Sequence, residues 1–284
     1  DLSRLNPTLV YASMTAFGQD GPRSTQTAYD HAIQATSGIT ASTGTETSGP
    51  IKAGAPMIDY ASGTMGAFAI SAALYKRMRT GTGQYIDLAM FDVAMILQSS
   101  PITDFLHSGH HPKRAGNRMR FASSSAYPTK EGLVQLAASN ARQHRRFYEA
   151  IGDPEEAKRS SLDDRYTRYE EKLAAVAEKM KEKTADEWEA YFQSRHVPAT
   201  RVRELREALA DPQLESRRVL HRHEDVPGIG KPLTVPLAAF TFAHGGPSIE
   251  RPPAGVGEHT DQVLSAIGYD VEQIAALRKA GAIA

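Results

Sequence analysis

The sequence predicts an α/β protein that also carries a small α+β domain. Over residues 1–108, strand-like and helix-like patterns alternate, which is typical of a sheet covered by helices. Residues 109–125 lose this periodicity and are rich in His, Lys, Arg, Gly and Ser, as expected of a linker. A predicted hairpin and several helices follow over 126–217, which is an α+β pattern. A chain of 284 residues is long enough to bury a sizeable core.

The first predicted element is a strand over Thr8–Met14, an apolar run that follows Asn6-Pro7. A loop containing Gly, Asp and Pro occupies 16–23, and a short helix is expected over Tyr29–Gly38. Residues 40–57 are rich in Gly, Ser, Thr and Pro and have little periodicity, so we expect mostly loop there.

The clearest helical pattern follows Asp59 and stops at Gly81. Its apolar residues obey the i, i+3, i+4, i+7, i+8 rule of an amphipathic helix, at positions 65, 68, 69, 72 and 73. Basic residues occupy its last turn, where the helix dipole favours them. Gln84–Met90 then alternates like a strand and leads into an apolar helix over 91–107.

The small domain is expected to begin with a hairpin over Ala126–Ala138 that turns at Lys130-Glu131-Gly132. Three helices follow: Gln143–Ile151, Tyr166–Lys183, and one that starts after Thr184, where Thr184-x-x-Glu187 is a capping box. The second has one apolar stripe, made of Leu173, Val176, Ala177 and Met180. Short β runs over 219–242 precede two terminal helices that start near Thr260 and Asp270.

Composition excludes several classes of function. Lys plus Arg and Asp plus Glu each number 33, so no net charge attracts the chain to nucleic acid or to anionic lipid. The absence of cysteine excludes disulfides and thiolate chemistry and fits a cytoplasmic, reducing compartment. The longest nearly apolar stretch, Met65–Tyr75, is too short to span a bilayer.

Common short motifs are missing, among them the P-loop and the G-x-S-x-G, H-E-x-x-H and EF-hand patterns. His107, His110 and His111 fit an exposed linker better than a metal site, because the chain has no cysteine and no group of carboxylates accompanies them in the sequence. The linker also contains a basic run of Lys113, Arg114, Arg118 and Arg120. A solvated linker explains this run most simply, and a phosphate-bearing ligand or a partner subunit are the alternatives.

Asp59 is the candidate catalytic residue, and its position alone leaves two interpretations open. It precedes the clearest helix, so its carboxylate is suited to cap the free amides there, a contribution of about 1 kcal/mol. The same amides would also keep the carboxylate ionised, and an accessible ionised carboxylate can act as a nucleophile.

Two groups of motifs follow one another along the chain in a fixed order. The first group is Phe17-Gly18-Gln19-Asp20-Gly21-Pro22, Tyr29-Asp30, Gln34-Ala35-x-x-Gly38 and Pro56-x-x-Asp59-x-x-x-Gly63. The second group is Ala73-Leu74-x-x-Arg77-x-x-Thr80-Gly81-x-Gly83-Gln84-x-Ile86-Asp87, Val197-Pro198, Asp211-Pro212-Gln213 and Gly257-Glu258-His259-Thr260-Asp261-x-Val263-Leu264. Together they resemble the family III coenzyme A transferases of the CaiB/BaiF type, which include formyl-CoA transferase, carnitine CoA-transferase and the related α-methylacyl-CoA racemases.

The resemblance implies an enzyme that uses acyl-CoA as a substrate and holds no tightly bound cofactor. It implies that Asp59 attacks the thioester to form a mixed anhydride, and that the released thiolate then forms an aspartyl-CoA thioester for the acceptor carboxylate to attack. It assigns to the thiol end of CoA the residues Met14, Thr15, Phe17 and Gly18. Gln19 and Tyr29 match active-site side chains, and amides near Gly18 or Gly63 are candidate oxyanion donors.

This sequence departs from two members of the family, and each departure disfavours one activity. The racemases have a proton-transferring His where this chain has Tyr29, and their later Glu has no counterpart near Asn140 to His144, so a racemase is the less favoured alternative. The Gly-rich loop of formyl-CoA transferase is not evident between Gly109 and Tyr127. The alternative outside the enzymes is a fragment without catalytic activity that binds CoA or serves as a scaffold for a dimer.

The resemblance also implies the overall organisation. A Rossmann-like large domain is expected over 1–108, interrupted by the small domain and resumed over 218–284. Family members resemble this chain only after roughly their first hundred residues, so we expect the start of the large domain and most contacts to the CoA nucleotide to be missing. If so, we expect exposed helix faces, poor stability and weak CoA affinity. An interlocked homodimer is the expected assembly, with acyl-CoA and a small carboxylic acid as the small-molecule partners.

Overall fold

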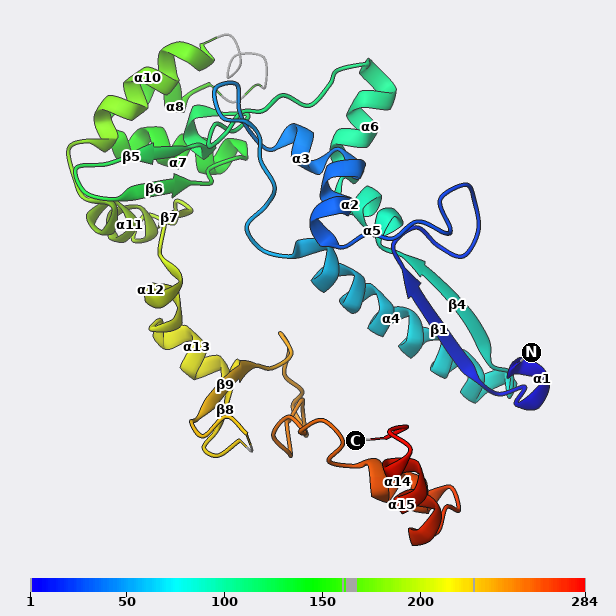
Figure 1. Cartoon of the computed structure of the whole chain (residues 1–284). Helices are drawn as coiled ribbons and strands as arrows, with labels where there is room; N and C mark the ends of the chain where they lie inside the picture. Colours follow the sequence, from blue (N-terminus) through cyan, green and yellow to red (C-terminus); the bar gives the residue numbers. More distant parts are fainter. Residues whose placement is uncertain (1, 160, 162–167, 227, 284) are drawn as a thin grey trace. The chain divides into compact units, whose positions relative to one another are not determined.

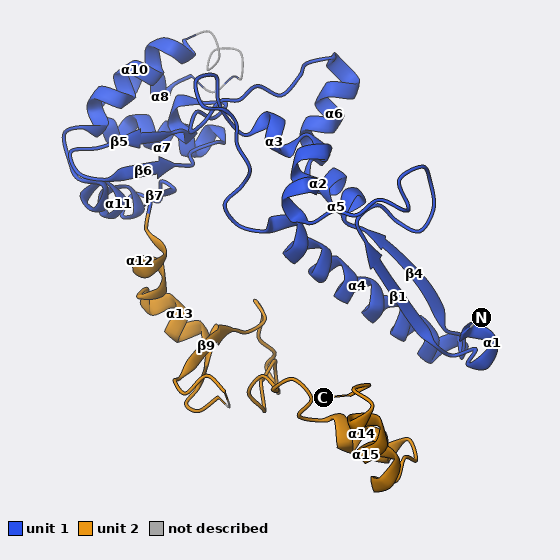
Figure 2. Ribbon diagram, in the orientation of Figure 1, with its two compact units in different colours: residues 1–202 blue, residues 203–284 orange. Residues whose placement is uncertain are grey.

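The computed structural model describes residues 2–159, 161, 168–226 and 228–283. The chain forms two compact units, Asp1–Val202 and Arg203–Ala284 (Figure 2). Both contain helices and small sheets, so the fold is mixed α/β (Figure 1). The predicted return of residues 218–284 to a large domain stays a prediction.

The part of unit 1 that precedes the linker contains most of the candidate site. Its elements are α1 (Leu2–Leu5), β1 (Val10–Thr15), α2 (Asp30–Ser37), α3 (Ile39–Ser42), β2 (Gly44–Thr45), β3 (Gly49–Pro50), α4 (Met57–Thr80), β4 (Gln84–Ala89), α5 (Met90–Leu97) and α6 (Ser99–Ser108). The predicted strands and the predicted short helix are confirmed as β1, β4 and α2. The single helix expected over 91–107 is two helices, because Pro101 has no N–H to continue the hydrogen bonding of α5.

Strands β1 and β4 form a two-stranded parallel sheet. Their register runs from Val10 opposite Gln84 to Thr15 opposite Ala89, so their carboxyl ends meet at one edge. A parallel pair needs a long crossover connection, and α4 supplies the helix that packs along both strands (Figure 1). The loop of the candidate site leaves β1 at this edge.

Helix α4 packs on the sheet mainly through small residues, and Ala73 is the one position of the predicted apolar stripe that is buried. Its buried positions include Ser62, Gly66 and Ala73, and a Cβ added at Gly66 would lie 3.0 Å from Cε of Met14. Phe68, in the middle of the apolar stripe, is 70% exposed. The stripe therefore predicted the helix correctly but not the face that packs on the strands. Small residues face the sheet because they allow the helix to approach it closely.

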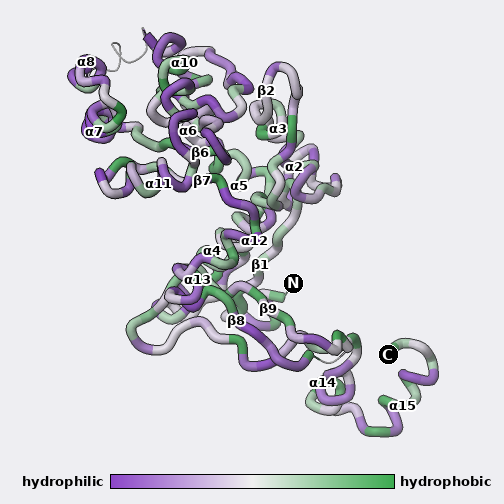
Figure 3. The backbone as a smooth tube through the Cα atoms, turned by 90° about the vertical axis from the view of Figure 1, so that its left-hand side faces the viewer, coloured by the Kyte–Doolittle hydropathy of each residue, from purple (hydrophilic) through white to green (hydrophobic). Residues whose placement is uncertain are grey.

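Hydrophilic residues interrupt α4, the longest described helix (Figure 3). Within the ranges that the structure describes, no helix is long and apolar enough to cross a membrane.

The second part of unit 1 is a three-stranded antiparallel sheet with helices packed around it. Its elements are the 3-10 turn η1 (Ala122–Ser124), β5 (Ala126–Pro128), β6 (Leu133–Leu136), α7 (Ala141–Ile151), α8 (Pro154–Ala157), α10 (Tyr169–Met180), α11 (Ala185–Gln193) and β7 (Ala199–Arg201), with sheet order β5-β6-β7. The predicted hairpin is confirmed, and so is the capping box at Thr184. The predicted helix over 166–183 is confirmed as α10, although its first two residues lie outside the described ones.

This part of the chain has its own hydrophobic core. The predicted α10 stripe is buried at Leu173, Val176 and Met180 and partly buried at Ala177. Trp188, the only tryptophan of the chain, is 1% exposed in this core, so its fluorescence reports specifically on the folding of this region.

Unit 2 contains a hairpin between two pairs of helices. Its elements are α12 (Leu205–Leu209), α13 (Pro212–Arg217), β8 (Leu220–His223), β9 (Leu233–Pro236), α14 (Thr260–Ala266) and α15 (Val271–Lys279). The hairpin pairs Leu220 with Pro236, as the short β runs predicted. A capping box between Asp270 and Gln273 starts α15, which confirms the predicted start of the last helix.

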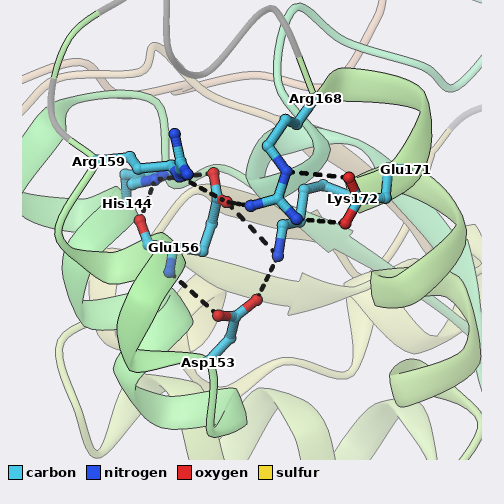
Figure 4. A network of polar contacts seen from close by, with 7 residues as sticks. All are labelled: His144, Asp153, Glu156, Arg159, Arg168, Glu171 and Lys172. Carbon is cyan, nitrogen blue, oxygen red and sulfur yellow. Dashed lines mark hydrogen bonds and ion pairs between the residues drawn. The ribbon is translucent and has the colours of Figure 1, made fainter.

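A network of charged side chains connects α7, α8 and α10 (Figure 4). At its centre is Glu156, which is 2% exposed and lies 3.4–3.6 Å from nitrogens of Arg168, Lys172 and Arg159. Nζ of Lys172 also donates to Oδ2 of Asp153 at 2.5 Å. A buried carboxylate needs such partners, because burial without them is strongly unfavourable.

The network predicts that this region loses stability in acid. Burial alone would raise the pKa of Asp153, but hydrogen bonds from Lys172 and from the backbone N–H of Glu156 outweigh it and hold that pKa below its usual value. A lowered carboxyl pKa stabilises the folded state above the pKa of the unfolded chain, about 4. This stabilisation is lost as the pH falls through the folded-state pKa. We therefore expect the urea concentration at the midpoint of unfolding, followed by Trp188 fluorescence, to decrease as the pH is lowered through that range.

Lys172→Met tests the source of this stability. The variant is expected to lose about 1.5–3 kcal/mol at pH 7, the contribution of a hydrogen bond to a charged group, and to flatten the acid dependence. The matched control is Lys158→Met, which removes an exposed ion pair with Glu155 that contributes about 0–1 kcal/mol. Equal losses of stability in the two variants would show that the buried network contributes no more than a surface pair.

Candidate active site

Asp59 lies in the first turn of α4, and its carboxylate is exposed. The helix starts at Met57, and Pro56 occupies the N-cap position, so the interpretation of Asp59 as the capping residue is wrong. Among the described residues, no hydrogen bond or ion pair reaches the Asp59 side chain. The structure therefore leaves this carboxylate free to react with a ligand.

The capping carboxylate belongs to Asp30, at the start of α2. Its Oδ2 accepts hydrogen bonds from the backbone N–H groups of Ile58 at 2.7 Å and of Asp59 at 3.2 Å. Asp30 is only 6% exposed, and its negative charge lies at the positive end of the α4 dipole. The carboxylate thus fixes the backbone of Asp59 without contacting its side chain.

Gln34 extends this arrangement to the segment before α4. Its Nε2 donates to Oδ1 of Asp30 at 2.5 Å, and its Oε1 accepts from the backbone N–H of Ala53 at 2.8 Å. The amides of Met57 and Tyr60 donate to backbone carbonyls of Ala55 and Pro56. All four first amides of α4 are therefore engaged, and none is available to a ligand.

The loop after β1 is held by a second carboxylate, Asp87 on β4. Oδ2 of Asp87 accepts from the backbone N–H of Gln19 at 2.9 Å, and Oγ1 of Thr15 accepts from the backbone N–H of Gly18 at 2.9 Å. The Gln19 side chain donates from Nε2 to Oγ of Ser13 at 2.7 Å. Gly18 has φ +88°, a backbone conformation that glycine adopts readily.

These hydrogen bonds make the backbone amides that were expected to stabilise an oxyanion poor candidates for that role. The amides of Gly18 and Gln19 already have acceptors, and Gly63 lies within α4, where helical hydrogen bonding uses its amide. A side chain is the better candidate donor. Nε2 of Gln19 carries two hydrogens, and its bond to Ser13 uses only one of them.

The other predicted site residues lie around this loop and the start of α2. Phe17 is partly buried, with its ring 5.9 Å from that of Phe91, and the guanidinium of Arg23 lies 3.8 Å from the Phe17 ring and 5.9 Å from the Phe91 ring. The side chain of Met14 touches α4 at Gly66. Tyr29 is 78% exposed, directly before the buried Asp30. Asp59 is thus held by contacts between α2 and α4, and the loop is held by contacts with β1 and β4.

Asp30 and Asp87 are the residues whose roles the sequence alone did not reveal. Both occur in the motifs Tyr29-Asp30 and Ile86-Asp87, but their acceptor groups act on amides 28 and 68 positions away in the sequence. The register that places Ser13 opposite Asp87 is the only signal that could have indicated the second contact.

Asp30 and Asp59 are expected to differ sharply in their effect on stability. Asp30→Ala should lower the free energy of unfolding by about 2–4 kcal/mol, because it removes a cap that contributes about 1 kcal/mol and leaves the buried Gln34 amide without an acceptor at a cost of about 1–3 kcal/mol. Asp59→Ala should cost less than about 1 kcal/mol, the value of an acid near a helix N-terminus. Urea unfolding followed by far-ultraviolet circular dichroism measures both. A larger loss for Asp59→Ala would contradict the capping assignment.

Comparison with known proteins identifies the family. A family model described as CoA-transferase family III matches residues 1–260. The chain is 33% identical over 277 residues to succinate–glutarate CoA-transferase of Agrobacterium fabrum, covering 92% of this chain and 66% of that protein. It is 28% identical over 288 residues to human succinyl-CoA:glutarate CoA-transferase, covering 100% of this chain and 65% of that protein. The chain thus spans about two thirds of the length of these curated relatives.

Solved structures show the same fold. A CAIB/BAIF family protein from Brucella suis superposes with a TM-score of 0.74 at 28% identity, over 94% of this chain and 70% of that one. The protein Rv3272 from Mycobacterium tuberculosis superposes with a TM-score of 0.79 at 26% identity, over 92% of this chain and 70% of that one. Since the family model covers most of the sequence and the fold agrees, the chain belongs to CoA-transferase family III.

Proposed function

We propose that this chain carries the nucleophile of a CoA-transferase, Asp59, which moves coenzyme A from an acyl-CoA to a carboxylic acid. One observation carries the proposal: Asp30 caps α4 and fixes the backbone of Asp59, while the Asp59 carboxylate has no hydrogen-bond or ion-pair partner in the described part of the chain. A carboxylate that is both held in place and free of partners is suited to nucleophilic catalysis.

The proposed reaction splits one exchange into covalent steps. An oxygen of Asp59 attacks the thioester carbonyl of the donor, the C–S bond breaks, and an aspartyl anhydride and free CoA thiolate result. The thiolate attacks the aspartyl carbonyl and releases the donor acid, which leaves an aspartyl-CoA thioester. The acceptor carboxylate attacks this thioester, the C–S bond breaks, and a second anhydride between Asp59 and the acceptor forms with release of the thiolate. The thiolate then attacks the acceptor's carbonyl, which forms the new acyl-CoA and releases the Asp59 carboxylate. Each bond broken is replaced, so no oxidant, metal or water is consumed.

The residues around the loop supply the proposed binding contacts. We assign the thiol end of CoA to Met14, Thr15, Phe17 and Gly18, and substrate contacts to Gln19 and Tyr29. The second Nε2 hydrogen of Gln19 is the proposed donor to the oxyanion that forms when the thioester carbonyl is attacked. Because Asp87 and Ser13 hold the backbone and the side chain of Gln19, this donor is oriented before substrate binds.

The substrates are proposed to include dicarboxylic acids. The relatives in Agrobacterium fabrum and in humans are both named for glutarate, and a relative in Acetobacter aceti is named acetyl-CoA:oxalate CoA-transferase.

We further propose a Rossmann-like large domain, an interlocked homodimer and a cytoplasmic location. The apolar stripe of α4 that includes Phe68 is exposed, which supports the proposal that either more of the large domain or a partner chain covers this face of the helix.

Asp59→Ala is expected to abolish CoA exchange while the protein remains folded, because the exposed side chain forms no hydrogen bond or ion pair with the described residues. Exchange between succinyl-CoA and ¹³C-labelled glutarate measures the activity, and circular dichroism measures the fold. Asp104→Asn, which alters an exposed carboxylate on α6, is the matched control and should retain full activity. Full activity in Asp59→Ala would refute the nucleophile assignment.

Intact-protein mass spectrometry tests the covalent intermediate directly. Incubation with a panel of acyl-CoAs that includes succinyl-CoA should add the mass of CoA less one water, and peptide mapping should place this adduct on Asp59. The adduct should be absent from Asp59→Ala. If no donor loads the wild-type chain, the transferase proposal fails for it. Incorporation of deuterium at the α-carbon of an acyl-CoA in heavy water would instead support racemase chemistry.

A further inference from the structure

An open cavity in unit 1 contains the basic run of the linker. Its volume is about 820 Å³, and it is bounded by Thr45–Thr47 between β2 and β3, by linker residues and by Tyr169 of α10. Four of its lining residues are cationic: Lys113, Arg114, Arg118 and Arg120. The candidate active site uses none of these residues.

Hydrogen bonds hold the linker in place on the side of the β2–β3 hairpin. The backbone N–H of Gly116 donates to the carbonyl of Gly44 at 2.7 Å. Arg114 donates from Nε to the carbonyl of Thr45 at 3.3 Å and from Nη1 to the carbonyl of Ala41 at 3.2 Å. A Cβ at Gly116 would lie only 2.7 Å from Cγ2 of Thr45, so the linker backbone passes very close to the hairpin.

The linker is also attached on the side of the small sheet. The carbonyl of Asn117 accepts from the backbone N–H of Ala126 at 3.0 Å, and the hydroxyl of Tyr169 donates to the carbonyl of Met119 at 3.0 Å. The backbone N–H of Met119 donates to Oγ of Ser125 at 2.9 Å. The basic run is therefore fixed at both ends, which a freely solvated linker would not be. Fixed cations lose less conformational entropy when a ligand binds.

The cavity has an excess of positive charge in a protein whose formal net charge is zero. Glu46 lies in its lining and Glu170 is 3.4 Å from Arg118, which offsets part of the charge. The two hydrogen bonds that Arg114 donates to Thr45 and Ala41 go to neutral carbonyls, so they do not compensate its charge. A concave surface with several cations concentrates anions and suits the oxygens of carboxylates and phosphates.

We propose that this cavity binds an oxyanion group of a substrate. The inference rests on the proposed function for the identity of that substrate, which offers two sources: the second carboxylate of a dicarboxylic acid and the phosphates of coenzyme A. Lys113 and Arg118 would bind the anion, and Arg114 would hold the linker against the hairpin. The cavity would bind the anionic end of a substrate whose reacting carbonyl or carboxylate lies at Asp59.

Isothermal titration calorimetry of the full chain tests the site without turnover. The probes are adenosine 3′,5′-bisphosphate, which carries phosphates of the CoA kind, and glutarate. The variant is Lys113→Gln with Arg118→Gln, which spares the anchoring Arg114. We expect binding of at least one probe to the wild-type chain and a rise in Kd of about tenfold or more in the variant, since one hydrogen bond between charged groups contributes about that factor.

The control variant is Lys158→Gln with Lys181→Gln, which removes two exposed cations elsewhere in unit 1 and should leave Kd unchanged. Trp188 fluorescence confirms that each variant is folded. Binding of the bisphosphate identifies the phosphate source, and binding of glutarate identifies the carboxylate source. Binding of neither probe, or equal Kd values in the two double variants, would overturn the proposal. Because the assay needs no CoA adduct on Asp59, its result is separate from that of the transferase test.

Discussion

The contact between the Asp30 carboxylate and the first turn of α4 is the constraint on which the candidate site depends. It joins α2 to α4 through the amides of Ile58 and Asp59, and through Gln34 it also fixes the backbone at Ala53. Because Asp30 is buried, its bonds form away from competing water. This one side chain therefore holds two of the first amides of α4, including that of Asp59.

Features encoded by neighbouring residues were predictable from the sequence. The capping boxes at Thr184 and Asp270 and the hairpin turn at 130–132 each depend on a few adjacent positions, and all three are confirmed. The start of α4 was placed three residues late, because its cap comes from Asp30 and not from a residue next to the helix. Local signals cannot reveal a cap that is supplied by another element.

The packing face of α4 could not be predicted for a related reason. Hydrophobic periodicity identifies a helix and an apolar stripe, but it does not say which surface covers that stripe. Here small residues such as Gly66 face β1 and β4, while Phe68 remains exposed. Likewise, the contact of Asp87 with Gln19 depends on the parallel register of two strands that are distant in sequence. The motifs contained both aspartates without showing what they bind.

Three aspartates near the site illustrate how surroundings decide the role of one residue type. Both oxygens of Asp30 accept hydrogen bonds in a buried position, so attack by this carboxylate would require breaking the cap of α4. Asp87 is exposed, but one of its oxygens holds the loop through the Gln19 amide. Of these three, Asp59 alone combines a fixed backbone with a side chain that has no hydrogen-bond or ion-pair partner among the described residues. The assignment of the cap to Asp30 therefore favours Asp59 as the reactive carboxylate, because capping was the alternative interpretation of Asp59.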